Sequence, residues 1–370
     1  MSRILVLNCG SSSVKYRLYD GDEVRGKGTV ERVGEPGGGP ADHESAVRQI
    51  IEGLDLTGLA GVGHRVVHGG RKFSAPVQID DRVIAAIEDL VPLAPLHNPA
   101  NLAGIRVALE KLPDTPQVAV FDTAFHHTLP EAAATYAIDR DLAERYGVRR
   151  YGFHGTSHAY VSRRTAELLD RPYDELNTIT LHLGNGASAC AVQGGRSVTT
   201  SMGMSPLEGL VMGTRSGDLD PTIIFHLRRE AGMGVDDIDD LLNHRSGLLG
   251  LTGVNDMREV LARRDAGDPA AALAFDVYRR RITGYVGAYY ALLGRVDAVT
   301  FTAGVGEHAA PVRAAALAGL DRLGIAVDPA RNAGSGDRVI SPDGAEVTVC
   351  VIGTDEEREI ARQTREVLNL

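Results

Sequence analysis

Four short polar segments, each at the end of an apolar run, contain side chains that could bind phosphate and a divalent cation. They are residues 8–13, 184–186, 304–306 and 354–356. Small residues let backbone N–H groups approach phosphate oxygens, and amide and carboxylate side chains supply the hard oxygen ligands that Mg²⁺ prefers. Because these segments are spread over the whole chain, we predict a phosphate site assembled from distant parts of the sequence.

Two arginines and a histidine lie in glycine-rich strings suited to anion capture. Arg65 occurs in GHRVVHGG, Arg215 in MGTRSGD and His154 in YGFHGTSH. An arginine can bind a phosphate or carboxylate through two parallel hydrogen bonds, and a histidine can donate to a transferring phosphoryl group. Taken alone, each arginine is more simply a surface residue. His154 and His158 could instead begin a zinc site, but no third ligand is near in sequence.

Asp122 ends the apolar run 118–121, at the strand end where ligand groups gather in open α/β sheets. It could be a general base, a group that orients the metal or its neighbours, or a simple turn residue. Near the C-terminus, Thr354 and Glu357 have the spacing of a helix capping box. That interpretation accounts for Glu357 and leaves Glu356 available for a metal.

Apolar runs predict the strands that must position these side chains. Residues 4–7, 14–19 and about 23–30 predict three consecutive strands, and the same order returns at 178–183, 187–192 and 197–200. A strand follows residues 8–13 and the string GxxxxGK[ST] is absent, which excludes a P-loop. We therefore predict a duplicated α/β domain.

Further periodic segments complete this prediction. Residues 118–121, 298–302 and 347–352 predict strands, 270–293 a long packed helix, and 356–370 a closing helix. The segment 303–307 is expected to be a two-glycine turn before a helix. The run Arg279-Arg280-Arg281 on the long helix is interpreted as a solvated face.

Length and charge limit the classes of function. At 370 residues the chain is long enough for two domains, and a net charge of −10 favours neither nucleic acid nor an anionic membrane. No signal-peptide core or spanning apolar stretch is apparent, so we expect a cytoplasmic protein. The 3 cysteines are far apart in sequence and are expected to be reduced thiols.

Taken in order, the longer strings resemble the acetate kinase family of the sugar kinase, actin and heat-shock ATPase superfamily. They are LNCGSSSVKY, GHRVVHGG, LAPLHNPAN, VFDTAFHHTLP, YGFHGTSH, HLGNGAS, SPLEGLVMGTRSGDLDP, FTAGVGE and TDEE. The resemblance implies reversible ATP-dependent phosphorylation of acetate to acetyl phosphate. It also implies an α/β fold made of duplicated βββαβαβα domains, ribonuclease H-like and of the actin/hexokinase type, with an interdomain active-site cleft. We predict an N-terminal domain of residues 1–122 plus 357–370 and a nucleotide-binding domain of residues 123–356.

The same resemblance assigns roles to particular residues. Catalysis is assigned to Asp122, Arg65, Arg215 and His154, of which His154 and Arg215 would stabilise the transition state. Asn8 and Glu356 would hold Mg²⁺, with Mn²⁺ as an alternative, and Ser11, Ser12 and Ser13 would form the phosphate loop. The acetate pocket would consist of Arg65, Val67, Leu96, Phe153 and Pro206. ATP or ADP would be bound by Lys15, His182, Leu183, Gly184, Asn185, Gly186, Gly213, Asp256, Met257, Arg258, Ala303, Gly304, Val305, Gly306 and Glu307. A homodimer is also implied.

Alternatives remain at this stage. A propionate or other short-chain carboxylate kinase differs only in pocket size, and Val67 is bulkier than the alanine expected for a larger acid, which favours acetate. From other classes, a nonenzymatic ATP-binding switch or a phosphatase would not need Arg65, His154 and Arg215 together. His308 and Asp355 stand where the family commonly has asparagine, which leaves the nucleotide preference open.

Overall fold

The computed structural model describes residues 2–10, 12–35, 38–95 and 97–370. The chain divides into two compact units. The first contains Met1–His127, Gly155–Ser157 and Asp355–Leu370, and the second contains Thr128–His154 and His158–Thr354. The predicted domain boundaries at residues 122 and 356 and the predicted cleft stay predictions.

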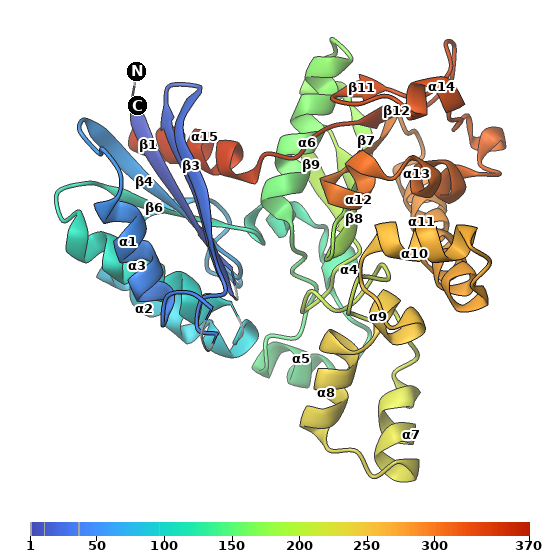
Figure 1. The fold of residues 1–370 in the computed structure, drawn as a ribbon, viewed down its shortest axis with the longest axis horizontal. Helices are drawn as coiled ribbons and strands as arrows, with labels where there is room; N and C mark the ends of the chain where they lie inside the picture. The colour runs from blue at the N-terminus through green and yellow to red at the C-terminus, as the bar shows by residue number, and fades with distance from the viewer. Residues whose placement is uncertain (1, 11, 36–37, 96) are drawn as a thin grey trace. The chain divides into compact units, whose positions relative to one another are not determined.

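Within the described residues, the first unit is built on one mixed sheet of six strands, in the order β3-β2-β1-β4-β6-β5 (Figure 1). β1, β2 and β3 are antiparallel, β4 and β6 continue parallel to β1, and β5 is a short antiparallel edge strand. Their bounds are β1 Arg3–Cys9, β2 Ser13–Asp20, β3 Glu23–Glu31, β4 Leu59–Val66, β5 Val77–Gln78 and β6 Gln117–Phe121.

The continuous apolar run in β1 is explained by helices on both faces of this sheet. Leu5 and Leu7 pack in a core with residues of α1 and α3, whereas Ile4 and Val6 pack with residues of α15. A strand covered on both sides has no polar face, so its sequence does not alternate between apolar and polar residues. The helices of this unit are α1 His43–Glu52, α2 Asp81–Asp89, α3 Asn98–Lys111 and α15 Glu356–Leu368, with 3-10 turns at Val91–Leu93 and Ala124–Thr128.

The second unit repeats the same strand arrangement. Within its described residues a six-stranded sheet has the order β9-β8-β7-β10-β12-β11, with three antiparallel strands, two parallel strands and an antiparallel edge. The bounds are β7 Asn177–Leu183, β8 Ala187–Gln193, β9 Arg196–Thr200, β10 Ala298–Thr302, β11 Arg338–Val339 and β12 Thr348–Val351. The predicted duplication of an α/β domain is therefore confirmed.

Long and short helices complete the second unit. The predicted long helix is α11, Pro269–Leu293, which packs on β7 and β8. The others are α4 Glu131–Ala134, α5 Arg140–Arg145, α6 Gly155–Leu168, α7 Thr222–Glu230, α8 Val235–His244, α9 Gly247–Thr252, α10 Met257–Asp265, α12 Ala303–His308, α13 Ala310–Leu317 and α14 Pro329–Asn332, with 3-10 turns at Tyr173–Glu175 and Asp321–Leu323. Among the described residues, no helix has the length and apolarity needed to cross a membrane. All three cysteines are buried, and none of them is in a disulfide bond.

Two local predictions were wrong. The segment 303–307 is not an open turn but belongs to the short helix α12. The closing helix α15 is capped by Asp355, whose side chain accepts from the Arg358 N–H, and not by Thr354 in a capping box. Asp355 directly precedes the helix, so its carboxylate can accept from the N–H of Arg358, the third helical residue, which has no partner within the helix. Glu357 therefore does not form a capping box with Thr354.

His64 provides a test of the first unit's core through pH. It lies in β4, is 2% exposed and is hydrogen-bonded through Nε2 to Gln117 Oε1 at 2.7 Å. Burial lowers the pKa of His64 to about 4, because the charged imidazolium loses its hydration. The unfolded chain, with a histidine pKa near 6.5, therefore binds a proton first as the pH falls.

We expect the His64 contribution to stability to be complete above pH ~6.5 and to fall by about 3 kcal/mol as the pH drops towards 4. Urea unfolding between pH 7 and 4 measures this loss. His64→Leu should flatten the pH dependence, whereas changing the exposed His226 to glutamine should leave it unaltered. If the free energy of unfolding depends on pH equally in His64→Leu and in the parent protein, the prediction is contradicted.

Candidate functional site

In the first unit, Arg65 and Asp122 form a buried ion pair at the carboxyl ends of two neighbouring parallel strands. Arg65 is near the end of β4 and Asp122 directly follows β6. The Arg65 Nε and Nη2 groups donate to Asp122 Oδ2 at 3.0 and 2.5 Å, and Thr156 Oγ1 donates to Asp122 Oδ1 at 2.9 Å. Asp122 is only 1% exposed. Both of its oxygens accept hydrogen bonds, which supports an orienting role over that of a turn residue.

Two further carboxylates influence the same arginine. Burial acts to lower the pKa of Arg65, but the charges of Asp122, Glu356 and Glu357 raise it above its ordinary value. For Glu356, burial raises the pKa to about 7; the charge of Arg65 opposes this rise, and those of Asp122 and Glu357 add to it. These acidic groups repel one another, and a bound cation would relieve that repulsion.

The donors present fit Mg²⁺ held jointly with a phosphate ligand. Among the described residues, no group of three or more histidine, cysteine or acidic side chains could hold a metal alone. Mg²⁺ commonly uses one or two carboxylates and takes its other ligands from water and substrate phosphates. Glu356 provides a carboxylate, and Asn8 provides an amide oxygen that also accepts from Arg65 Nη1 at 3.2 Å. Both are therefore suitable, and their metal role stays a prediction.

The start of α15, which carries Glu356, is tied to β2 by a residue that the sequence analysis missed. Arg17 Nη1 donates to Asp355 Oδ1 at 2.6 Å, and Arg17 Nη2 lies 3.7 Å from Glu357 Oε2. Asn8 Nδ2 donates to Glu357 Oε1 at 3.4 Å. Asp355 thus combines a helix cap with an ion pair. The alternation of residues in β2 could have drawn attention to Arg17, but no local pattern identifies its partner.

The other predicted residues of the first unit are distributed along the same strands. Lys15 is exposed, and in the antiparallel pairing of β1 with β2 it lies opposite Asn8. Ser12 is exposed, and Ser13 begins β2. Val67 is 5% exposed and its N–H donates to Asn101 Oδ1 at 3.0 Å. Ser11 and Leu96 lie outside the described residues.

In the second unit, Arg215 and His154 approach the same glycine. A Cβ atom placed on Gly186 would lie 3.5 Å from Arg215 Nη1 and 3.5 Å from His154 Nε2. Gly186 directly precedes β8, so a cationic and an imidazole side chain meet beside exposed backbone of the first hairpin of this sheet. This is the arrangement expected of an anion site.

His154 is held by a chain of hydrogen bonds. Its Nδ1 is 2.9 Å from Ser188 Oγ, which is in turn 2.8 Å from His158 Nε2, and His158 Nδ1 is 2.7 Å from Thr180 Oγ1. The His154 ring also stacks on that of His182, with centroids 4.1 Å apart. Its backbone has φ 55°, a conformation that costs a histidine of order 1–3 kcal/mol. His158 is thus a buried supporting residue.

Arg215 differs from Arg65 in having no carboxylate partner among the described residues. Its Nη1 donates to the Pro206 carbonyl at 3.2 Å and approaches Met212 Sδ at 3.7 Å. Burial lowers the pKa of Arg215. A partly buried cation without a counter-ion is costly to maintain, and an anionic ligand would compensate for it. Phe153, 3% exposed, directly precedes His154 in the chain.

A cavity of about 580 Å³ in the second unit brings together seven of the fifteen residues predicted to bind ATP or ADP. Such a volume lies in the usual range for small-molecule sites. Of the predicted residues it is lined by Gly184, Asn185, Asp256, Met257, Arg258, Gly304 and Val305. Its wall also contains Leu248, Asn255, Leu261, Tyr278, His308, Ala309 and Pro311. Most of these were missed because apolar residues at helical spacing are indistinguishable from core residues in sequence.

The remaining predicted nucleotide residues lie outside this wall. Gly213 donates its N–H to the Asn185 carbonyl at 2.9 Å. Gly306 and Glu307 have their carbonyls bound by the buried Arg313, and Glu307 Oε1 accepts from the Thr354 N–H at 3.1 Å. The Glu307 side chain is therefore hydrogen-bonded to the backbone of Thr354. Leu183 is fully buried, His182 is mostly buried, and Ala303 starts α12.

Comparison with known proteins identifies the family to which the chain belongs. The acetokinase family matches residues 3–362. Acetate kinase of Streptomyces avermitilis is 60% identical, over 98% of this chain and 96% of that protein. The crystal structure of Porphyromonas gingivalis acetate kinase superimposes with a TM-score of 0.94 at 43% identity, over 100% of both chains. A propionate kinase from Francisella tularensis gives a TM-score of 0.93 at 40% identity, over 99% of this chain and 100% of that one. The chain belongs to the acetokinase family.

Proposed function

We propose that this protein catalyses the reversible transfer of a phosphoryl group from ATP to acetate, forming acetyl phosphate and ADP by direct in-line attack. The observation that carries the proposal is Arg215, a partly buried cation without a carboxylate partner in the described structure, close to His154 and Gly186. These groups lie in the same unit as a nucleotide-sized cavity that Asn185 helps to line.

Electrostatics is the main difficulty of this reaction. A carboxylic acid with a pKa near 4 is already ionised at neutral pH, so the nucleophile needs no general base. It is instead repelled by the phosphates of ATP. Arg65, Arg215 and His154 would reduce this repulsion and stabilise charge on the transferring phosphoryl group. Asp122 would orient Arg65, because it accepts two hydrogen bonds from the Arg65 guanidinium and is buried.

Asn8 and Glu356 would hold Mg²⁺ together with the nucleotide phosphates. When bound, the metal would neutralise charge on the β- and γ-phosphates. The protein's own contribution is to keep these oxygen donors in place: Asn8 is hydrogen-bonded to Arg65 and Glu357, and Asp355 caps the helix that begins with Glu356.

The decisive experiment combines the protein with ATP, Mg²⁺, acetate and hydroxylamine. Acetyl phosphate reacts with hydroxylamine, so acetohydroxamate should accumulate only when all components are present. Hydrolysis of ATP without hydroxamate would indicate a phosphatase, and binding without turnover a nonenzymatic switch. With a chiral γ-phosphate, inversion is expected for one direct transfer, and retention would indicate a phosphoenzyme.

A propionate kinase is the second candidate, because the Francisella tularensis relative carries that name. We predict that Val67→Ala raises kcat/KM for propionate relative to acetate by about 10-fold, since one methylene is worth about 1–3 kcal/mol in an apolar pocket. Steady-state kinetics with both acids measures the ratio. Ala119→Gly, at a buried position in β6, is a control for general loosening of the sheet. If the ratio of kcat/KM for propionate and acetate is unchanged in Val67→Ala, Val67 does not line the acid pocket.

The homodimer and the cytoplasmic location belong to the same proposal and rest on family membership. Light scattering at micromolar concentration should give twice the mass of the chain. A mass of one chain would contradict the dimer without affecting the proposed reaction.

A further inference from the structure

The segment that carries Arg215 is a loop closed at its neck by Asp218. The Asp218 N–H donates to the Gly209 carbonyl at 2.9 Å, and the Gly209 N–H donates back to Asp218 Oδ1 at 2.8 Å. Gly209 has φ +110°, where a side chain would also clash with Ser201. The loop from Gly209 to Asp218 is therefore joined at its two ends by these hydrogen bonds, and Arg215 lies within it.

Helix α11 holds this neck from one side. Tyr285 donates its hydroxyl to Asp218 Oδ2 at 2.8 Å, and Arg281 donates to the carbonyls of Gly209 and Asp218 at 3.0–3.2 Å. Arg281 Nη1 also lies 3.2 Å from Asp218 Oδ2. Burial and the nearby Asp218 raise the pKa of Tyr285, so it stays a hydrogen-bond donor at neutral pH.

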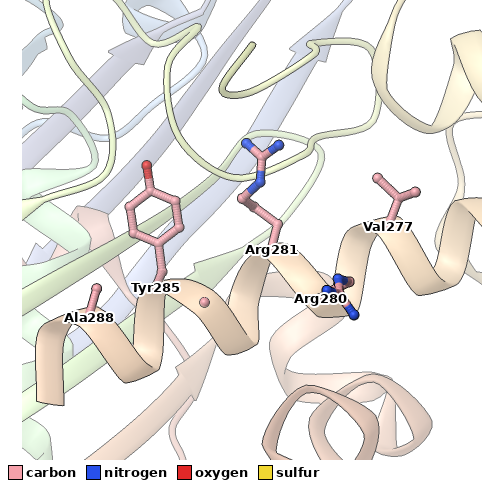
Figure 2. Close-up of a pocket in the computed structure, with 6 residues that line it drawn as sticks. Val277, Arg280, Arg281, Tyr285 and Ala288 are labelled. Atoms are coloured by element: carbon pink, nitrogen blue, oxygen red, sulfur yellow. The ribbon is translucent and has the colours of Figure 1, made fainter. Parts of the chain in front are cut away.

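Figure 2 shows that Arg281 and Tyr285 extend to the same side of α11, beside an open cavity of about 420 Å³ that they help to line. Arg280 also lines this cavity but is exposed, and no ion pair of Arg280 is found among the described residues. The arginine run predicted to be a solvated face thus contains one residue, Arg281, that holds the Arg215 loop. That part of the prediction was wrong.

A second carboxylate holds the chain just before the loop. Glu208 Oε1 accepts from Arg150 Nη2 at 2.5 Å, and Glu208 Oε2 accepts from the Tyr136 hydroxyl. Arg150 Nη1 also donates to the carbonyls of Thr200, Ser201 and Met202. Glu208 is two residues from Pro206, whose carbonyl accepts from Arg215.

We propose that Asp218 and Glu208 are positioning residues for Arg215, acting through Tyr285 and Arg281 on one side and through Arg150 and Tyr136 on the other. This inference rests on the proposed phosphoryl transfer. No carboxylate within the described structure pairs with Arg215 and fixes its guanidinium directly, so its place depends on the backbone that carries it and on the Pro206 carbonyl. Displacement of a catalytic group by about 1 Å can cost on the order of 100-fold in rate.

The first test removes one hydroxyl. Tyr285→Phe should lower kcat by about 10- to 100-fold with little change in KM for ATP, because the nucleoside cavity does not include this residue. Tyr290→Phe is the matched control: Tyr290 is on the same helix, and among the described residues its hydroxyl makes no hydrogen bond. Asp218→Asn, which replaces the carboxylate by an amide, should lower kcat at least as much as Tyr285→Phe.

A double-mutant cycle separates positioning from general support of the fold. Tyr285→Phe is combined with Arg215→Lys, and kcat/KM for acetate is measured in all four proteins. If Tyr285 acts through Arg215, its effect should be much smaller in the Arg215→Lys background.

Equal losses in both backgrounds, or neither Tyr285→Phe nor Asp218→Asn differing from the Tyr290→Phe control, would overturn the inference. A parent protein that forms no acetohydroxamate would instead refute the proposed function, so the two failures are distinguishable.

Discussion

Arg215→Ala is expected to lower kcat by about 10³- to 10⁵-fold while changing the free energy of unfolding by less than about 2 kcal/mol. The kinetic effect is large because the Arg215 guanidinium and His154 both lie beside Gly186, and because a charge-stabilising arginine supplies much of the rate of phosphoryl transfer. The stability effect is small because the folded protein loses one hydrogen bond to a carbonyl, one weak contact with a thioether sulfur and one partly buried charge that has no carboxylate partner in the described structure.

Hydroxamate formation and urea unfolding measure the two quantities on the same samples. Arg280→Ala is a suitable control, since Arg280 is exposed and has no ion pair among the described residues. Arg215→Lys should recover only part of the rate, because a lysine cannot make two parallel hydrogen bonds to one anion. Turnover of a folded Arg215→Ala protein within about 10-fold of the parent would end the proposed mechanism.

Arg65→Ala should differ from Arg215→Ala by damaging both activity and stability. The substitution leaves the Asp122 carboxylate buried, with Thr156 as its remaining hydrogen-bond donor among the side chains described. Breaking one side of a buried pair typically costs about 3–5 kcal/mol. We expect an unfolding loss of that size at neutral pH and a fall in kcat of about 10²- to 10³-fold, because a preorganised donor to the phosphoryl group is lost.

The control is the double variant Arg65→Ala, Asp122→Asn. An asparagine carries no charge, so most of the lost stability should return, whereas the rate should not. Denaturant midpoints and steady-state kinetics distinguish the two quantities. Asp122→Asn is also measured alone. If the losses of unfolding free energy in Arg65→Ala and Asp122→Asn simply add in the double variant, the two side chains are not energetically coupled, which contradicts the prediction.

The sequence predicted most of the sheet architecture correctly because strands leave a local signal. The run 4–7 is apolar over its full length, and the run 178–183 has an apolar residue at every second position; each is followed by a small polar segment and a second strand-like run. Both pairs are antiparallel hairpins in the structure, β1 with β2 and β7 with β8. The period of two and the turn residues are properties of neighbouring amino acids, so no tertiary information is needed.

The prediction failed where a side chain has its partner far away in sequence. Arg281 looked like part of a solvated face because its neighbours are arginines, yet its partners are backbone carbonyls about 60 to 70 residues earlier. Glu357 fitted a capping box by spacing, but it accepts from Asn8, which is 349 residues away. The cavity of about 580 Å³ that is proposed for the nucleoside is lined by Tyr278, which the local pattern assigns to the core side of α11.

By itself the sequence determined the two sets of three consecutive strands, the order in which they repeat, and the polar and glycine-rich strings that carry the arginine, histidine and amide side chains. Only the tertiary structure decided how those charges are compensated: Arg65 is paired with Asp122, whereas Arg215 has a carbonyl and a sulfur as its side-chain contacts in the described structure. The reason is that electrostatic energy depends on separation in space, which the fold sets between residues distant in the chain.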